Sequence, residues 1–172
     1  MAGGMTRVVL DASVAVATAL SLPYSPQAAR LLEHLSGAEI YVPALWEYEV
    51  VSTLRKSVAL GRSTSAEAEG ALERMLVLPS TRVAPDPGLH RAALRWADRL
   101  GQVVAYDAQY LALAERLGAE FWTADRRLVE RARESGLVWV RWVGEAGELY
   151  GRPSEDTPQS RMESVDSSRA SL

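Results

Sequence analysis

Two acidic side chains stand where runs typical of buried strands come to an end. Val8, Val9 and Leu10 in "VVLDAS" lead directly into Asp11, and the apolar start of "FWTADRRL" leads into Asp125. Ligands of open α/β sheets gather at the carboxyl ends of the strands, so both positions are suited to present a carboxylate to a ligand. Each acid can also cap the helix that follows it, and for a single acid at such a position the cap is the more frequent role.

Two further acids fall in segments with helical spacing. Asp107 lies near the start of one predicted helix, and "VPALWEYEVVSTLRK" offers both Glu47 and Glu49 on another. At about 100° per residue, Glu47 aligns with Val51 and Leu54 in the apolar stripe, whereas Glu49 falls among polar residues. A polar stripe on an otherwise buried helix is typical of a cleft wall. The spacing therefore favours Glu49, and Glu47 stays open as the alternative.

Three or four carboxylates in one cleft imply a metal ion. They repel one another and cannot all stay ionised at low cost without a cation. Ligation by carboxylate oxygens alone is the preference of Mg²⁺ and Mn²⁺. Such an ion lowers the pKa of a bound water and stabilises charge that develops on a phosphate. The chemistry this indicates is phosphodiester hydrolysis.

The two histidines offer no alternative chemistry. His34 and His90 stand alone in predicted helices, so we do not expect an acid/base role for either.

The elements that must position these acids alternate along the chain. Apolar runs with strand character are followed by segments with helical periodicity, and this alternation predicts an α/β fold in which a parallel β-sheet is sandwiched by helices. The predicted strands cover 8–10, 39–43, part of 80–88, 120–124 and 137–143, and the predicted helices cover 13–21, 26–35, 45–60, 65–77, 89–100, 105–117 and 126–134.

Composition divides the chain at residue 144. Residues 145–172 hold six of the 22 acidic residues and three of the 19 basic ones, so the part before them is balanced at 16 of each. That balance excludes the broad basic excess of a protein that binds nucleic acid by charge alone. Residues 145–172 are also poor in large apolar side chains, and we expect a disordered acidic tail there. The predicted folded domain covers 6–144.

The chain has no cysteine, which excludes a disulfide framework, a thiol nucleophile and a thiolate zinc site. No apolar run approaches the about 20 residues needed to span a bilayer. The opening "MAGGMTR" lacks the charged start and the cleavage pattern of a signal peptide. We therefore expect no association with membranes and a cytoplasmic location.

The chain resembles a known family in four stretches. "VVLDASVAVA", "VPALWEYEVVSTLRK", "VVAYDAQYLALAERLGAEFWTADRRL" and "LVWVRW" look like the PIN domain, in particular the VapC-type ribonuclease toxins of bacterial toxin-antitoxin pairs. The likeness covers roughly residues 6–143, with all four acidic motifs in the family order, and its most specific part is "YDAQYLALA" followed by "TADRRL".

The resemblance implies a set of site residues. In the family, Asp, Glu, Asp and Asp surround a divalent metal, and the match of "EVVSTL" selects Glu49 over Glu47. Mg²⁺ or Mn²⁺ is the implied cofactor. The implied catalytic residues are Asp11, Glu49, Asp107 and Asp125, the implied metal ligands are Asp11, Asp107 and Asp125, and the supporting hydroxyls are Ser13 and Thr123.

The resemblance also implies partners: an RNA substrate, a cognate antitoxin that blocks the acidic cleft, and a second copy of the chain in a homodimer.

Other functions of an α/β fold with acids at its strand ends are the alternatives. A response-regulator receiver needs a lysine after a late strand, and Lys56 is the last lysine; a haloacid-dehalogenase-like phosphatase needs an Asp where Ser13 stands. A catalytically silent PIN-fold binding or scaffold protein is the remaining alternative, against which the complete acid set argues.

Overall fold

The computed structural model describes residues 6–150. Its centre is a five-stranded sheet in the order β3-β2-β1-β4-β5, and every neighbouring pair of strands is parallel. The predicted parallel α/β sheet is therefore confirmed. The strands are β1 (Arg7–Leu10), β2 (Glu39–Pro43), β3 (Thr81–Val83), β4 (Glu120–Thr123) and β5 (Val140–Trp142).

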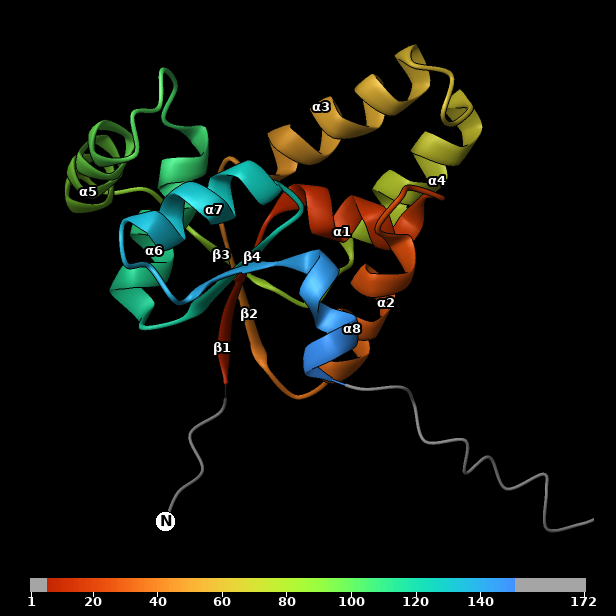
Figure 1. Ribbon diagram of the computed structural model, residues 1–172. Helices are drawn as coiled ribbons and strands as arrows, with labels where there is room; N and C mark the ends of the chain where they lie inside the picture. Colours follow the sequence, from red (N-terminus) through yellow and green to blue (C-terminus); the bar gives the residue numbers. More distant parts are fainter. Residues whose placement is uncertain (1–5, 151–172) are drawn as a thin grey trace, which may run out of the picture.

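Helices cover both faces of the sheet (Figure 1). On one face lie α1, α2 and α8, and on the other lie α5, α6 and α7, while α3 and α4 project as an arm above α1. The helices are α1 (Ala12–Ala19), α2 (Ser25–His34), α3 (Trp46–Ala59), α4 (Ser65–Leu76), α5 (Pro87–Arg99), α6 (Tyr106–Leu117), α7 (Arg126–Glu134) and α8 (Ala146–Leu149), and a 3-10 turn, η1, covers Val143–Glu145.

The strand register sets where the first acid lies. Leu10 of β1 is paired with Trp122 of β4, and the next backbone N–H, that of Asp11, donates to the Trp122 carbonyl at 3.0 Å. The strand order reverses at this β1–β4 pair, because the chain proceeds from β1 to β2 on one side and from β4 to β5 on the other. Such a switch point, outside the carboxyl ends of the strands, is where ligands of open α/β sheets bind.

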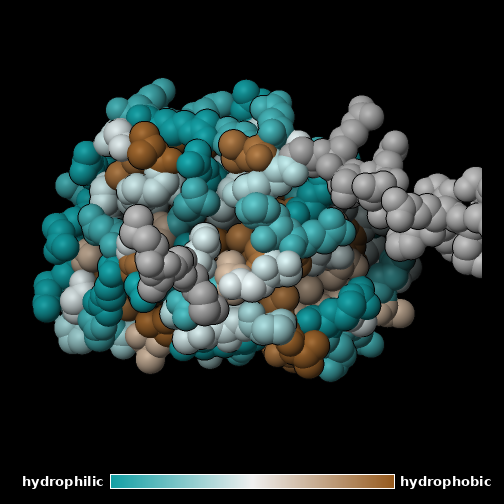
Figure 2. All heavy atoms as spheres, turned by 90° about the horizontal axis from the view of Figure 1, so that it is seen from below, coloured by the Kyte–Doolittle hydropathy of each residue, from teal (hydrophilic) through white to brown (hydrophobic). Residues whose placement is uncertain are grey.

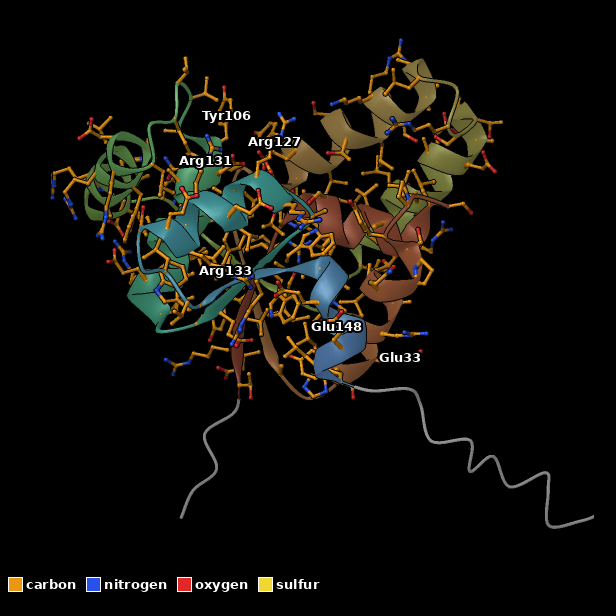
Figure 3. All side chains as sticks on the ribbon, viewed as in Figure 1. Glu33, Tyr106, Arg127, Arg131, Arg133 and Glu148 are labelled. Carbon is orange, nitrogen blue, oxygen red and sulfur yellow. The ribbon has the colours of Figure 1, made fainter. Side chains whose placement is uncertain are left out.

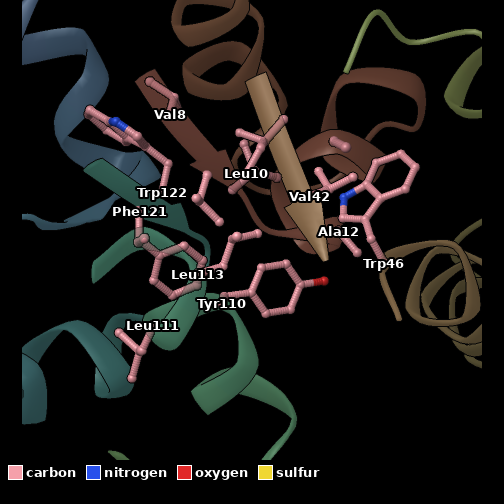
Figure 4. Packing of buried hydrophobic residues seen from close by; sticks show 14 of the residues in the cluster. Val8, Leu10, Ala12, Val42, Trp46, Tyr110, Leu111, Leu113, Phe121 and Trp122 are labelled. Atoms are coloured by element: carbon pink, nitrogen blue, oxygen red, sulfur yellow. The ribbon is translucent and has the colours of Figure 1, made fainter. Parts of the chain in front are cut away.

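The hydrophobic core lies directly beneath this switch point (Figure 4). Leu10 and Trp122 have no exposed side-chain surface, and neither has Phe121. The ring of Tyr110, on α6, stacks on Phe121 with centroids 5.4 Å apart and 15° between the planes. The Tyr110 hydroxyl points toward the side on which Ala12 and Trp46 lie (Figure 4). A rigid floor therefore supports the strand ends.

Local capping chemistry accounts for two helix starts. The capping box expected at the start of α4 is present: Thr64 Oγ1 accepts the N–H of Glu67, and the Glu67 carboxylate accepts the N–H of Thr64. The helix expected from residue 89 begins earlier, at Pro87. The reason is a cap that periodicity did not reveal, because Asp86 accepts the N–H of Gly88 at 2.7 Å and that of Leu89 at 3.0 Å.

The fold continues past the boundary predicted at residue 144. Glu145 accepts two hydrogen bonds of 2.7 Å from Arg133, and Ala146 of α8 is buried. The ring of Tyr150 stacks on His34 with centroids 3.5 Å apart. This segment is held by an ion pair, one small apolar residue and one aromatic ring. The prediction missed it because it was based on the number of large apolar residues. Residues 151–172, the rest of the predicted tail, lie outside the described residues.

The edge of the sheet opposite the strand ends has a mixed surface. Viewed from that side, apolar side chains form separate patches among polar ones (Figure 2).

Between residues 6 and 150, no helix is long and apolar enough to cross a membrane.

Candidate active site

Asp11 lies at the centre of a hydrogen-bond network at the end of β1. Its Oδ2 accepts hydrogen bonds from Ser13 Oγ at 3.0 Å and from Thr123 Oγ1 at 2.5 Å, and its Oδ1 accepts the N–H of Ser13 at 3.3 Å. The last bond caps α1. Asp11 is partly buried, and this burial raises its pKa in spite of the hydrogen bonds from Thr123 and Ser13, which lower it.

The two hydroxyls that hold Asp11 also fix the end of β4. Thr123 Oγ1 accepts the N–H of Asp125 at 3.0 Å, and Ser13 Oγ accepts the N–H of Ala124 at 3.3 Å. Asp125 in turn caps α7, because its Oδ1 accepts the N–H of Leu128 at 3.0 Å. Ser13 and Thr123 thus link the two strand ends. Asp11 and Asp125 each cap a helix, and both also stand at the same edge of the sheet.

Glu49, not Glu47, is directed toward this edge. Glu49 is half-buried and accepts a hydrogen bond from the hydroxyl of Tyr110. The pKa of Glu49 is raised to about 7. Burial is the main cause, and the charges of Asp11 and Asp107 also contribute, whereas the hydrogen bond from Tyr110 lowers the pKa. Glu47 is exposed and forms an ion pair of 3.1 Å with Arg82 instead. The choice of Glu49 agrees with this geometry.

The apolar stripe predicted for this helix was nevertheless wrong in part. Val51, which was expected to be in the apolar stripe, is 52% exposed, and the buried stripe of α3 contains Trp46, Val50 and Leu54. Glu49 is adjacent to that buried stripe, three residues after Trp46. Glu49 is half-buried there, and Thr53 and Lys56 follow it on the same side of the helix.

Asp107 completes the group from the first turn of α6. Burial raises its pKa to about 6, with contributions from the charges of Asp11 and Asp125, and the cation of Arg131 acts in the opposite direction. Gln102 Nε2 donates to Asp107 Oδ2 at 3.2 Å. Neither Gln102 nor Tyr110 was among the site residues predicted from the sequence. Tyr110 carried a signal, since it lies three residues after Asp107 and so on the same face of the helix.

The four acids lie close enough to influence one another. Each of Asp11, Glu49 and Asp107 has a raised pKa to which at least one other acid of the group contributes. The carboxylate oxygens nevertheless accept hydrogen bonds from groups of the protein itself. Among the described residues, no three His, Cys, Asp or Glu side chains are arranged to hold a metal ion. The potential ligands are all carboxylates, and this type of ligand fits Mg²⁺ or Mn²⁺.

This electrostatic arrangement predicts an unusual dependence of stability on pH. The folded-state pKa values of Asp107 and Glu49, about 6 and about 7, exceed their ordinary values of 3.8 and 4.5. The folded chain therefore binds more protons than the unfolded chain in this window, and stability falls as pH rises. In EDTA, we expect the free energy of unfolding by urea to be lower at pH 8 than at pH 5. A stability that rises over this window would contradict the assignment.

Comparison with known proteins gives consistent matches. A family model described as PIN domain matches residues 8–134. Ribonuclease VapC9 of Mycobacterium tuberculosis is 36% identical over 133 residues, which cover 77% of this chain and 97% of the relative. Ribonuclease VapC12 of the same organism is 34% identical over 123 residues, which cover 72% of this chain and 90% of the relative.

Solved structures share the same fold. PAE2754 from Pyrobaculum aerophilum superposes with a TM-score of 0.60 at 26% identity, covering 86% of this chain and 93% of that one. VapC20 of Mycobacterium tuberculosis, described as a sarcin-ricin loop cleaving toxin, gives a TM-score of 0.57 at 18% identity, covering 78% of this chain and 98% of that one. The second likeness is a likeness of fold alone.

Proposed function

This chain belongs to the PIN-domain family, and from that membership we propose that it is a metal-dependent endoribonuclease of the VapC type, which hydrolyses phosphodiester bonds of RNA. The observation that supports this function is the mutual influence of four carboxylates from four segments of the chain, which contributes to the raised pKa values of Asp11, Glu49 and Asp107. Acids with pKa values shifted by burial and by each other are typical of functional sites.

Each proposed site residue has a distinct part. Asp11, Asp107 and Asp125 would hold Mg²⁺ or Mn²⁺, which supplies an activated water and stabilises charge on the phosphate. Ser13 and Thr123 fix Asp11 through the hydrogen bonds described above, so that its carboxylate cannot rotate freely. The list of proposed catalytic residues is that of the family resemblance: Asp11, Glu49, Asp107 and Asp125.

Glu49 is suited to move a proton. A carboxyl group with a pKa of about 7 exchanges its proton readily at neutral pH, and this is the property a general base or acid needs. The hydroxyl of Tyr110 donates to the Glu49 carboxylate and holds its orientation. Burial and the neighbouring acids raise the pKa of Tyr110 far above its ordinary value, so that this hydroxyl stays protonated and remains a donor.

Cations suited to RNA phosphates lie along the same edge of the molecule. Figure 3 shows Arg127 and Arg131 of α7 at the edge where the strands end, on the same side as Tyr106. Arg131 is near enough to lower the pKa of Asp107. Because the body of the chain has no net basic excess, we propose that RNA is held by such local contacts beside the carboxylates and not by a broad charged surface.

We further propose the partners implied by the family. A nuclease toxin in its own cell has to be restrained, so a cognate antitoxin that covers the acidic cleft is the expected protein partner. A homodimer is the expected state of the chain alone. The antitoxin, the homodimer and the cytoplasmic location stay predictions.

Light scattering tests the two assemblies. We expect the mass of a dimer for the purified chain alone, and the mass of a larger complex after coexpression with the product of the neighbouring gene.

Metal-dependent cleavage is the experiment that tests the function. We expect the purified chain to cut RNA oligonucleotides in Mg²⁺ or Mn²⁺, to stop when EDTA is added, and to resume when the metal is restored in excess. DNA of the same sequence is the comparison substrate. If no RNA is cut with either metal, although the protein is folded and free of antitoxin, the silent scaffold alternative is correct.

A further inference from the structure

A second concave feature lies beside the carboxylates. A pocket of about 240 Å³ opens between the carboxyl ends of β2 and β3 and the helices α5 and α6. Its walls are mainly apolar, and no Asp, Glu, Lys or Arg lines it. Three polar side chains, those of His90, Tyr106 and Gln109, are at its boundary. We call it the β2–β3 pocket.

The β2–β3 pocket and the acidic site share two elements. On α6, Tyr106 and Gln109 line the pocket, while Asp107 and Tyr110, each one residue further along, belong to the acidic site. One residue corresponds to about 100° around a helix, so the two sets occupy adjacent faces. At the start of α3, Leu45 lines the pocket, and its carbonyl accepts the N–H of Glu49 at 3.1 Å. The pocket is therefore next to the proposed cleavage site.

The polar groups of the pocket are available to a ligand. No hydrogen bond within residues 6–150 engages the carboxamide of Gln109 or the imidazole of His90. A carboxamide offers one acceptor and two donor hydrogens in a plane, which matches the edge of a nucleobase. Tyr106 is 64% exposed, so its ring is accessible to a planar ligand (Figure 3).

From these observations we propose that the β2–β3 pocket binds one nucleobase of the RNA substrate, next to the phosphate that is cut, and that Gln109 contributes to base preference. The proposal rests on the proposed ribonuclease function. The volume of about 240 Å³ is below the about 300–1,000 Å³ of pockets for larger ligands and suits a single planar ring system. Apolar walls with few polar groups suit a neutral base that is unstacked from its strand, and they do not suit a phosphate.

Cleavage of a randomised RNA oligonucleotide pool tests the proposal. Wild type should prefer one base at a fixed position beside the cut. Gln109→Leu keeps the size of the side chain but removes its hydrogen bonds, and we expect the preference at that position to fall about tenfold, as for the loss of a hydrogen-bonded base edge. Cleavage of the disfavoured sequences should change little. An unchanged base profile in Gln109→Leu would overturn the proposal.

A matched pair of tyrosines separates stacking from general effects. Tyr106→Ala should raise KM for the preferred RNA at an unchanged kcat, because it removes a ring on which the base stacks. Tyr48→Ala is the control, since Tyr48 is 80% exposed on α3 and lines no part of the pocket. If the pocket variants instead convert a dimer to a monomer in light scattering and leave the base profile unchanged, the pocket is a subunit contact and the proposal is wrong.

A binding measurement keeps the pocket testable if the wild type cuts no RNA. The chain contains two histidines, and their imidazole proton resonances serve as probes. His90 is at the pocket, whereas His34 stacks on Tyr150 at another part of the fold and is the internal reference. The four nucleoside 5′-monophosphates are titrated separately, at up to millimolar concentration. At least one of them should shift the imidazole resonances of His90 and not those of His34, and it should bind more weakly to Gln109→Leu. If none shifts His90 selectively, the base site is refuted independently of cleavage.

Discussion

Replacing Asp107 by Asn should reduce metal-dependent RNA cleavage by at least about a thousandfold. A metal-bound site supplies several kcal/mol of transition-state stabilisation, and each 1.36 kcal/mol corresponds to about a factor of ten in rate. Asparagine keeps the shape of the side chain but removes the ligand charge. Glu49→Gln should cause a loss of similar size, because it removes the carboxylate that Tyr110 orients. Initial rates on a single RNA substrate measure both.

The matched control for this prediction is Glu47→Gln. Glu47 lies two residues before Glu49 on the same helix, but it is exposed and paired with Arg82. Exposed ion pairs contribute little to stability, so this variant should cleave at close to the wild-type rate. Asp107→Asn should also be at least as stable as wild type without metal, because it removes a buried charge whose ionisation is unfavourable. Full activity in a contaminant-free preparation of Asp107→Asn would refute its role as a ligand.

The largest expected loss of stability follows replacement of Trp122 by Ala. Trp122 is completely buried in β4, is paired with Leu10 in β1, and donates from Nε1 to Glu120 at 3.1 Å. Removal of a large buried ring typically costs about 3–5 kcal/mol, from lost burial and from the cavity that remains. We expect a fall of that size in the free energy of unfolding by urea, a large part of the about 5–15 kcal/mol of a typical domain.

Trp139→Ala is the comparison for the tryptophan prediction. Trp139 is only partly buried and meets the edge of Trp96 with ring centroids 6.2 Å apart, so its loss should cost clearly less. Equal losses for the two variants would mean that the β1–β4 pair is not the rigid centre of the fold.

The alternation of strand-like and helix-like segments was sufficient to predict the sheet. Buried parallel strands read as short apolar runs, and "VVL" and "EFWT" are such runs in the observed β1 and β4. The positions of Asp11 and Asp125 followed from the same reasoning, because each comes just after one of these strands. Local signals of this kind are strong when an element is buried on both faces.

Other features depend on contacts that periodicity does not encode. The orientation of Glu49 is set by packing of α3 through Trp46 and by the hydroxyl of Tyr110, which is 61 residues away in the chain. Gln102 comes from the loop before α6 and meets Asp107 only after the chain turns. The end of the fold depends on the ion pair between Arg133 and Glu145 and on the stacking of Tyr150 on His34, both of which join separate segments. Side-chain pairs between distant segments were not predictable from spacing alone.

Calorimetric titration with Mn²⁺ tests the four-acid site most directly. The pKa values of about 6 for Asp107 and about 7 for Glu49 mean that metal binding near pH 6.5 must release protons. Titration of the wild-type chain in two buffers with different ionisation enthalpies should therefore show binding with proton release, and Asp107→Asn should bind at least about tenfold more weakly, a difference of about 1.4 kcal/mol. Failure of the wild type to bind Mn²⁺ at millimolar concentration, or equal binding by Asp107→Asn, would contradict a metal site formed by these carboxylates.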